Sequence, residues 1–135
     1  MRQSSTPKRA CRRGATIANA YKLREILGVG GMGVVFAADL DDGQSVAIKL
    51  LPFELSNNPR AARRIRDEAR AARYVSHPNV VSVLDVSAPD DPITFVVMER
   101  VAGVQLNRVL RGTVMPLLRA ADIARQILAG LDAIH

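Results

Sequence analysis

Polar and apolar residues alternate over residues 21–27. Residues 21–27 read Tyr-Lys-Leu-Arg-Glu-Ile-Leu, and residues 34–38 and 45–51 are two further runs rich in β-branched and small apolar residues. Because neighbouring side chains of a strand point to opposite faces, the pattern predicts three strands. Residues 40–43, Leu-Asp-Asp-Gly, predict a turn between the second and third strands, and Pro52 ends the third.

A helical pattern follows after Asn58, which predicts an N-cap with Pro59 at the first helical position. Ile65, Ala69 and Ala72 share one face of this helix. Glu68 lies close to that face, where a carboxylate is costly unless it is paired. The remaining face is predicted to be solvated, and it is basic, with Arg60, Arg63, Arg64, Arg66, Arg70 and Arg73.

Two more apolar runs, residues 80–86 and 93–98, predict strands separated by a loop. A short helix over 106–110 and a long one over 117–135 follow, the latter with an apolar stripe of Ile123, Ile127, Leu131 and Ile134. The predicted fold class is α+β, with a five-stranded antiparallel sheet and one main helix packed against it.

Charge is unevenly distributed along the 135 residues, which suffice for one domain or part of a larger one. Five of the six net positive charges fall within residues 1–14. We predict a disordered basic tail over 1–18. It is either a solvated leader or an arm for nucleic acid or a membrane surface. Aromatic residues make up only 4%, which argues against stacking on nucleic-acid bases.

Cysteine usage and hydropathy bear on the cellular compartment. The single cysteine, Cys11, cannot form a disulfide within the chain and fits a reducing compartment. No apolar run approaches the roughly 18 residues of a membrane span, and the N-terminus lacks the apolar core of a secretory signal. We therefore expect a cytoplasmic protein.

The candidate chemistry lies between residues 27 and 49. Gly28, Gly30 and Gly33 form a G-x-G-x-x-G pattern, and Lys49 ends the third predicted strand. Glycines let backbone N–H groups approach a phosphate, and a lysine can reach the same phosphates as a point charge. A dinucleotide-binding fingerprint needs a helix after the glycines, whereas residues 34–38 favour a strand. No Gly-Lys-Ser/Thr sequence of a Walker A loop occurs.

The motifs G-x-G-x-x-G-x-V and Val-Ala-Ile-Lys, both complete here, resemble the N-terminal lobe of protein kinases. The resemblance runs from about Tyr21 to His135 and is strongest to the eukaryotic-type serine/threonine kinases of bacteria. It includes Arg-Asp-Glu-Ala at 66–69, His-Pro-Asn-Val-Val at 77–81 and a hinge at 97–101. It implies a kinase-like N-lobe over 19–101. The hinge exit and the first two helices of an incomplete C-lobe then occupy 102–135.

The resemblance also implies roles for individual residues. Lys49 would hold the α- and β-phosphates of ATP, and Glu68 would pair with Lys49. The loop over the phosphates would consist of Gly28, Val29, Gly30, Gly31, Met32 and Gly33. The adenine would contact Leu27, Val35, Ala47, the gatekeeper Met98, the Glu99 C=O and the Val101 N–H.

Phosphoryl transfer in this family also needs His-Arg-Asp…Asn and Asp-Phe-Gly, and neither occurs in the 135 residues. We therefore expect an N-terminal fragment of an ATP-dependent serine/threonine kinase, inactive alone, with the protein ligands of Mg²⁺ absent and the protein substrate unknown. The alternative is a catalytically inactive nucleotide-binding or protein-interaction module. Its apolar stripe over 117–135 could then mediate self-association.

Overall fold

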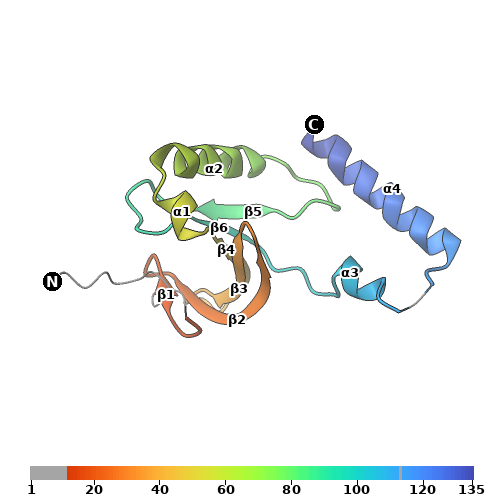
Figure 1. Ribbon diagram of the computed structural model, residues 1–135, viewed down its shortest axis with the longest axis horizontal. Helices are drawn as coiled ribbons and strands as arrows, with labels where there is room; N and C mark the ends of the chain where they lie inside the picture. Colours follow the sequence, from red (N-terminus) through yellow and green to blue (C-terminus); the bar gives the residue numbers. More distant parts are fainter. Residues whose placement is uncertain (1–11, 113) are drawn as a thin grey trace.

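The computed structural model describes residues 12–112 and 114–135, so most of the predicted tail lies outside the described residues. Figure 1 shows a curled sheet with one helix across it and two helices extending to the other side. The strands are β1 (Thr16–Ile17), β2 (Tyr21–Gly30), β3 (Gly33–Asp39), β4 (Ser45–Leu50), β5 (Val83–Val86) and β6 (Phe95–Glu99). The helices are α1 (Phe53–Ser56), α2 (Pro59–Ala72), α3 (Leu106–Val109) and α4 (Leu117–Ile134).

All strand pairs are antiparallel, and the sheet order is β1-β2-β3-β4-β6-β5. The predicted α+β fold class is confirmed, but the sheet has six strands where the sequence pattern predicted five. The additional strand is β1, and Ile17 within it is only 6% exposed. The predicted tail is therefore wrong for Thr16–Ile17, because this segment pairs with β2 and contributes to the core.

The core lies on one face of the curled sheet. Its side chains come from alternate positions of the strands, which is the pattern the sequence predicted. The members are Ile17, Tyr21, Leu23, Phe36, Ala38, Val46, Ile48, Leu50, Phe95 and Val97. The opposite face of β3, β4 and β6 is thereby left for the candidate site.

Helix α2 begins as predicted. The Asn58 side chain accepts hydrogen bonds from the N–H groups of Arg60 (3.1 Å) and Ala61 (3.2 Å), with Pro59 at the first helical position. The short helix α1 was not predicted, because four residues carry too little periodicity to be recognised. Helix α2 packs against β5 and α1.

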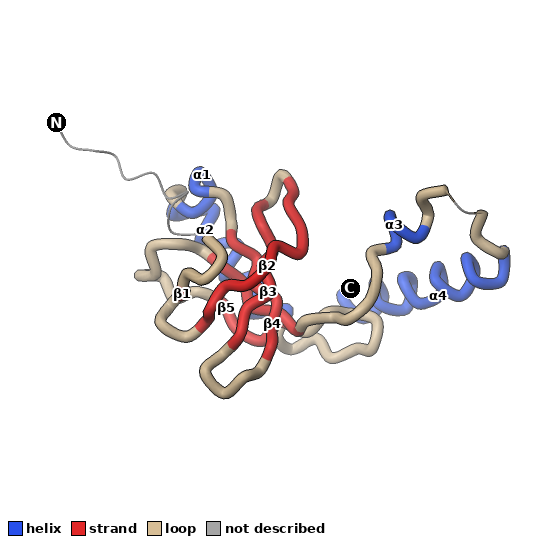
Figure 2. The backbone as a smooth tube through the Cα atoms, turned by 90° about the horizontal axis from the view of Figure 1, so that it is seen from below, coloured by secondary structure: helices blue, strands red, loops and turns tan. Residues whose placement is uncertain are grey.

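Helices α3 and α4 extend away from the sheet, as Figure 2 shows from below. Helix α4 contacts the segment that precedes β5. The Asn79 side-chain amide donates to the Gln126 side chain (3.1 Å), and Gly130 lies directly against the Asn79 backbone. Gly130 is the one buried residue of α4.

Candidate functional site

The register of the sheet brings four predicted site residues to one face. Val35 of β3 pairs with Lys49 of β4, and Ala47 pairs with Met98 of β6. Directly paired residues share a face, and residues two apart on a strand share it too. Val35, Ala47, Lys49 and Met98 therefore lie together, on the face opposite the core residues Phe36, Ile48 and Val97.

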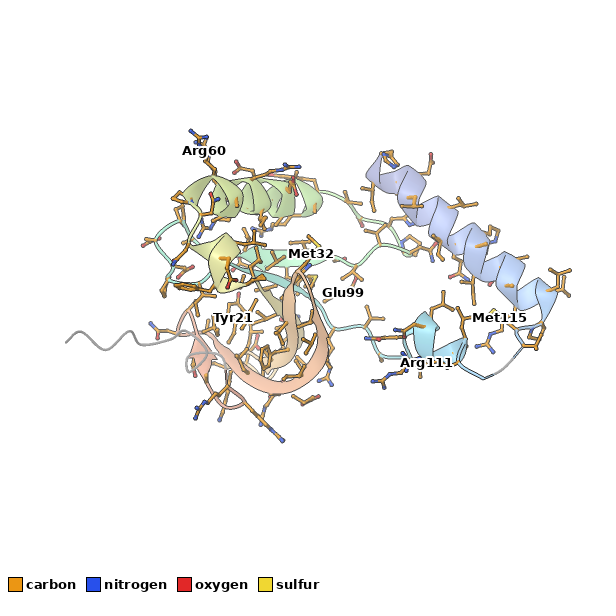
Figure 3. All side chains as sticks on the ribbon, in the orientation of Figure 1. Tyr21, Met32, Arg60, Glu99, Arg111 and Met115 are labelled. Atoms are coloured by element: carbon orange, nitrogen blue, oxygen red, sulfur yellow. The ribbon has the colours of Figure 1, made fainter. Side chains whose placement is uncertain are left out.

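The glycine-rich segment is a β-hairpin that continues this face. Gly28 pairs with Val35 and Gly30 with Gly33, so Gly31 and Met32 form a two-residue turn. Figure 3 labels Met32 at the tip of the hairpin, where its side chain is 68% exposed. The tip is thus free of packing and open to a ligand.

The glycines of the hairpin serve different physical purposes. A Cβ at Gly30 or Gly31 would meet nothing within 4 Å, so the backbone there is open to close approach. Gly33 has φ +120° and a Cβ there would collide with the carbonyl oxygen of Leu50. Gly33 is therefore required by the fold of β3 against β4, whatever the loop binds.

The other residues predicted to contact ATP differ in their exposure. Leu27 and Met98 are half-buried, whereas Val29 and Val101 are exposed. The Glu99 carboxylate accepts a hydrogen bond from the Ser82 N–H at 2.7 Å, which fixes the end of β6. Gly28 lies near the Gln105 side chain, so the hairpin and the segment after β6 approach one another.

The predicted pair between Lys49 and Glu68 is not formed in this structure. The Glu68 carboxylate instead accepts a hydrogen bond from Nε of Arg64 at 2.8 Å, one helical turn earlier, and its side chain is 63% exposed. This bond raises the pKa of Arg64. Lys49 is half-buried and makes no ion pair within the part of the chain that the structure describes. Residues three or four apart on a helix meet without any tertiary packing, which explains why Arg64 reaches Glu68 here.

One arginine of α2 departs from the predicted solvated face. Arg66 is only 8% exposed and lies with Ala62 and Ala69 on the side of α2 that faces the sheet. The predicted apolar face of Ile65, Ala69 and Ala72 is thus displaced around the helix. The positions 62, 66 and 69 have the i, i+4, i+7 spacing of a buried face, and that spacing is the signal that could have identified Arg66.

Tyr21 links the first long strand to the far edge of the sheet. Its hydroxyl donates to the Asp85 carboxylate at 3.0 Å, and Arg73 at the end of α2 lies 3.8 Å from the same carboxylate. Burial, and then the bond to Asp85, raise the pKa of Tyr21 to about 12. This contact ties β2, β5 and α2 together behind the site.

Neither a metal cluster nor a membrane span is found among residues 12–112 and 114–135. No three His, Cys, Asp or Glu side chains gather there as a metal site would require. No helix in the same residues is both long and apolar enough to cross a membrane.

Comparisons with known proteins match most of the chain. The family model of the protein kinase domain matches residues 21–135. Serine/threonine-protein kinase pkn3 of Myxococcus xanthus is 38% identical over 124 residues, which cover 90% of this chain and 23% of pkn3. PrkC of Bacillus subtilis is 36% identical over 125 residues, with 90% of this chain and 19% of PrkC covered. PknA of Mycobacterium tuberculosis is 36% identical over 128 residues, with 90% and 30% covered.

The chain thus spans less than a third of the length of these relatives. Among solved structures, a crystal structure of the kinase domain of Mycobacterium tuberculosis PknI superimposes with a TM-score of 0.78 at 24% identity. That match covers 93% of this chain and 51% of the PknI chain. A second PknI structure gives a TM-score of 0.76. At 24% identity, the similarity to the PknI structures shows the fold alone.

Proposed function

The chain belongs to the protein kinase family, and on this premise we propose that it forms the ATP-binding lobe of a serine/threonine protein kinase. The observation that carries the proposal is the shared face of Val35, Ala47 and Lys49 beside the glycine hairpin. Apolar side chains and a lysine without an ion-pair partner on one face suit a ligand with an apolar ring at one end and phosphates at the other.

The residues present fit ATP at each of its parts. The adenine would pack on Leu27, Val35 and Ala47, with Met98 behind it and the backbone of Glu99 and Val101 along its edge. The open backbone at Gly30 and Gly31 leaves room for phosphates beneath the hairpin. Lys49 would supply the positive charge, because no acidic partner within the described residues neutralises it.

Glu68 would serve as the second partner of Lys49 once phosphates are bound. An exposed ion pair within one helix, such as Arg64 with Glu68, is weak. Separating Glu68 from Arg64 requires a change of side-chain rotamer, because both residues lie on α2, and this change therefore meets little resistance from the pair. Pairing with Glu68 would then hold the Lys49 ammonium in one position on the phosphates.

A chain of these 135 residues is expected to bind ATP without transferring its phosphoryl group. The sequence contains neither His-Arg-Asp nor Asp-Phe-Gly, so no residue here is assigned to receive the proton of a substrate hydroxyl. The described residues also do not fit Mg²⁺, since they hold no cluster of acidic side chains. Serine or threonine as the acceptor is proposed from the relatives alone.

The test is a calorimetric titration of the chain with ATP, comparing the unaltered protein with Lys49→Met. We expect binding that Lys49→Met weakens by about tenfold or more, because a charge-assisted contact to phosphate is lost. Lys22→Met, at an exposed lysine on β2, is the matched control and should bind as the unaltered chain does. Equal binding by the Lys49 and Lys22 variants would refute the proposed site.

A second candidate function is a protein-interaction module, and the exposed apolar residues of α4 favour it. Ile127 is 49% exposed, Leu131 47% and Ile134 57%, all on the stripe predicted from sequence. Exposed apolar stripes of this kind commonly mark interaction surfaces. Self-association through α4 is compatible with ATP binding, because the two surfaces lie on different elements.

A further inference from the structure

The Arg100 side chain crosses the face of the candidate site at the end opposite Lys49. Its Nη1 donates to Ser45 Oγ at 3.0 Å, and its Nη2 donates to the Glu25 carboxylate at 2.8 Å. Ser45, Ala47 and Lys49 alternate along β4, so they share one face of the strand. Lys49 would therefore lie at the phosphate end of this face, and Arg100 lies at the other end, beside the proposed position of adenine.

A bulge in β2 places Glu25 on the same face. The register between β2 and β3 shifts by one residue at Arg24 and Glu25, which together stand opposite Ala37. Ala37 pairs directly with Ala47 of β4, so both belong to the face of the candidate site. A bulge can redirect a side chain, and here the Glu25 carboxylate is in position to accept the bond from Arg100.

The bond between Arg100 and Glu25 joins elements that are not neighbours in the sheet. Strands β3 and β4 lie between β2 and β6, so no backbone ladder connects the glycine hairpin to the end of β6. Figure 3 labels Glu99, the last residue of β6, where the chain leaves the sheet toward α3. Among the described residues, the backbone of residues 100–104 makes no hydrogen bond to another backbone group. The Arg100 side chain is thus the polar anchor of this segment.

The proposed space for the base is bounded by the two parts that Arg100 connects. Leu27 of β2, which is half-buried, is the proposed apolar contact of the ring. The Val101 N–H, the proposed partner of the ring edge, belongs to the peptide unit that follows Arg100. Farther along, a Cβ at Gly28 would lie 3.9 Å from Nε2 of Gln105, so β2 approaches the segment after β6 there as well.

We propose that Arg100 is a positioning residue for the base of ATP. With its guanidinium bonded to β2 and β4, the gap between Leu27 and the Val101 N–H has a set width before the nucleotide binds. A site whose width is already set loses less conformational freedom on binding, and its affinity is higher for that reason. The inference rests on the proposed ATP site.

The experiment titrates the full chain with ATP, adenosine and inorganic tripolyphosphate and follows binding by NMR chemical shifts. Adenosine carries the base without phosphates, and tripolyphosphate carries phosphates without the base. Arg100→Ala and Glu25→Ala should each weaken the binding of ATP and adenosine by about twofold to fivefold, because an exposed ion pair is weak. The double variant should bind no more weakly than either single variant. At about 0.15 M salt, which screens charges more than ~8 Å apart, tripolyphosphate affinity should not change.

The two single variants distinguish a positioning contact from an effect of charge alone. ATP is an anion, so a pure charge effect would make Arg100→Ala weaken ATP binding and Glu25→Ala strengthen it. A positioning contact predicts that both variants weaken it. The exchange of charges in Arg100→Glu/Glu25→Arg re-forms the ion pair and should recover part of the adenosine affinity.

The matched control is Arg24→Ala, in the same bulge of β2. Nε of Arg24 pairs with the Asp39 carboxylate at 2.6 Å. This pair connects β2 to β3, two strands that already form a hydrogen-bonded ladder. Its loss should leave the affinity for all three ligands unchanged.

Failure of this inference and failure of the proposed function give different results. If the unaltered chain binds none of the three ligands, the proposed function fails and the role of Arg100 fails with it. If Lys49→Met weakens the binding of ATP and tripolyphosphate but Arg100→Ala leaves adenosine affinity unchanged, the ATP site stands and the inference is overturned. Stronger ATP binding by Glu25→Ala overturns it as well, and so does an unaltered chain that binds ATP but no adenosine.

Discussion

The sheet and helix α4 bury their apolar residues to very different degrees. In the sheet, Leu23, Ile48 and Val97 are at most 1% exposed, and each strand pairs with a neighbour. In α4, Leu117 and Leu118 are more than 80% exposed and Gly130 is the one buried residue. Buried apolar area is the main source of folding free energy. The sheet with α1 and α2 therefore stabilises itself, whereas α4 depends on whatever covers its apolar side.

The largest effect on stability is expected for Gly33→Ala, which should destabilise the sheet and leave the helical structure of α4 unaffected. The methyl group would collide with the Leu50 carbonyl and occupy a backbone conformation that alanine rarely adopts. We expect a loss of about 3 kcal/mol or more in the free energy of unfolding, measured by urea denaturation. Gly31→Ala, with open space around the new Cβ, is the matched control and should cost less than about 1 kcal/mol. Equal losses would show that the hairpin does not pack as described.

A smaller loss of folding free energy should result when Tyr21, which connects β2 to β5 and α2, ionises at high pH. Its pKa is raised to about 12 from 10, so the folded state favours the neutral phenol. The stabilisation is fully present below the unfolded pKa of about 10 and is lost as the pH rises through about 12, with an upper limit of about 3 kcal/mol. The measurement is tyrosinate absorbance as a function of pH, compared between the unaltered chain and Tyr21→Phe.

The step in tyrosinate absorbance that Tyr21→Phe removes is expected near pH 12. In Tyr21→Phe, the loss of stability between pH 10 and 12 should be smaller, and about 1 kcal/mol should already be missing at neutral pH. If the step that Tyr21→Phe removes lies near pH 10 instead, the bond from Tyr21 to Asp85 is not maintained. The sheet would then lack the side-chain bond between β2 and β5.

Much of the fold could be predicted from local pattern. Alternation identified β2, apolar β-branched runs identified β4 and β6, and the Asn58 cap marked the start of α2. These signals lie within a few residues of the features they describe. Strand β1 was missed since it has two residues. The turn after it relies on positive φ at Ala18 and Asn19, which alanine rarely adopts.

The positions of some site residues follow from local pattern and those of others do not, for a related reason. The register that places Val35, Ala47 and Lys49 on one face follows from period-two alternation and the turns between neighbouring strands. The spacing of Ala62, Arg66 and Ala69 is a local signal for the burial of Arg66. The hydroxyls that bind its guanidinium are 21 and 28 residues away, and no local pattern reveals them. The motif resemblance predicted Lys49 as the partner of Glu68. In the structure, Glu68 pairs with Arg64 of the same helix.

The smallest expected effect on stability, and the sharpest on association, comes from the α4 stripe. Ile127→Gln/Leu131→Gln removes two side chains that are about half exposed, so the unfolding free energy of the sheet should change by less than about 0.5 kcal/mol. The chain has no tryptophan, and the buried Tyr21 reports unfolding of the sheet by fluorescence.

Sedimentation velocity over a concentration series should show association of the unaltered chain that the double variant weakens, because apolar area is removed from the contact. Ala121→Gln, exposed and about 120° around the helix from the middle of the stripe, should associate as the unaltered chain does. If the unaltered chain is monomeric at all concentrations, α4 is not a self-association surface. If the double variant instead unfolds the sheet, the two regions are not independent.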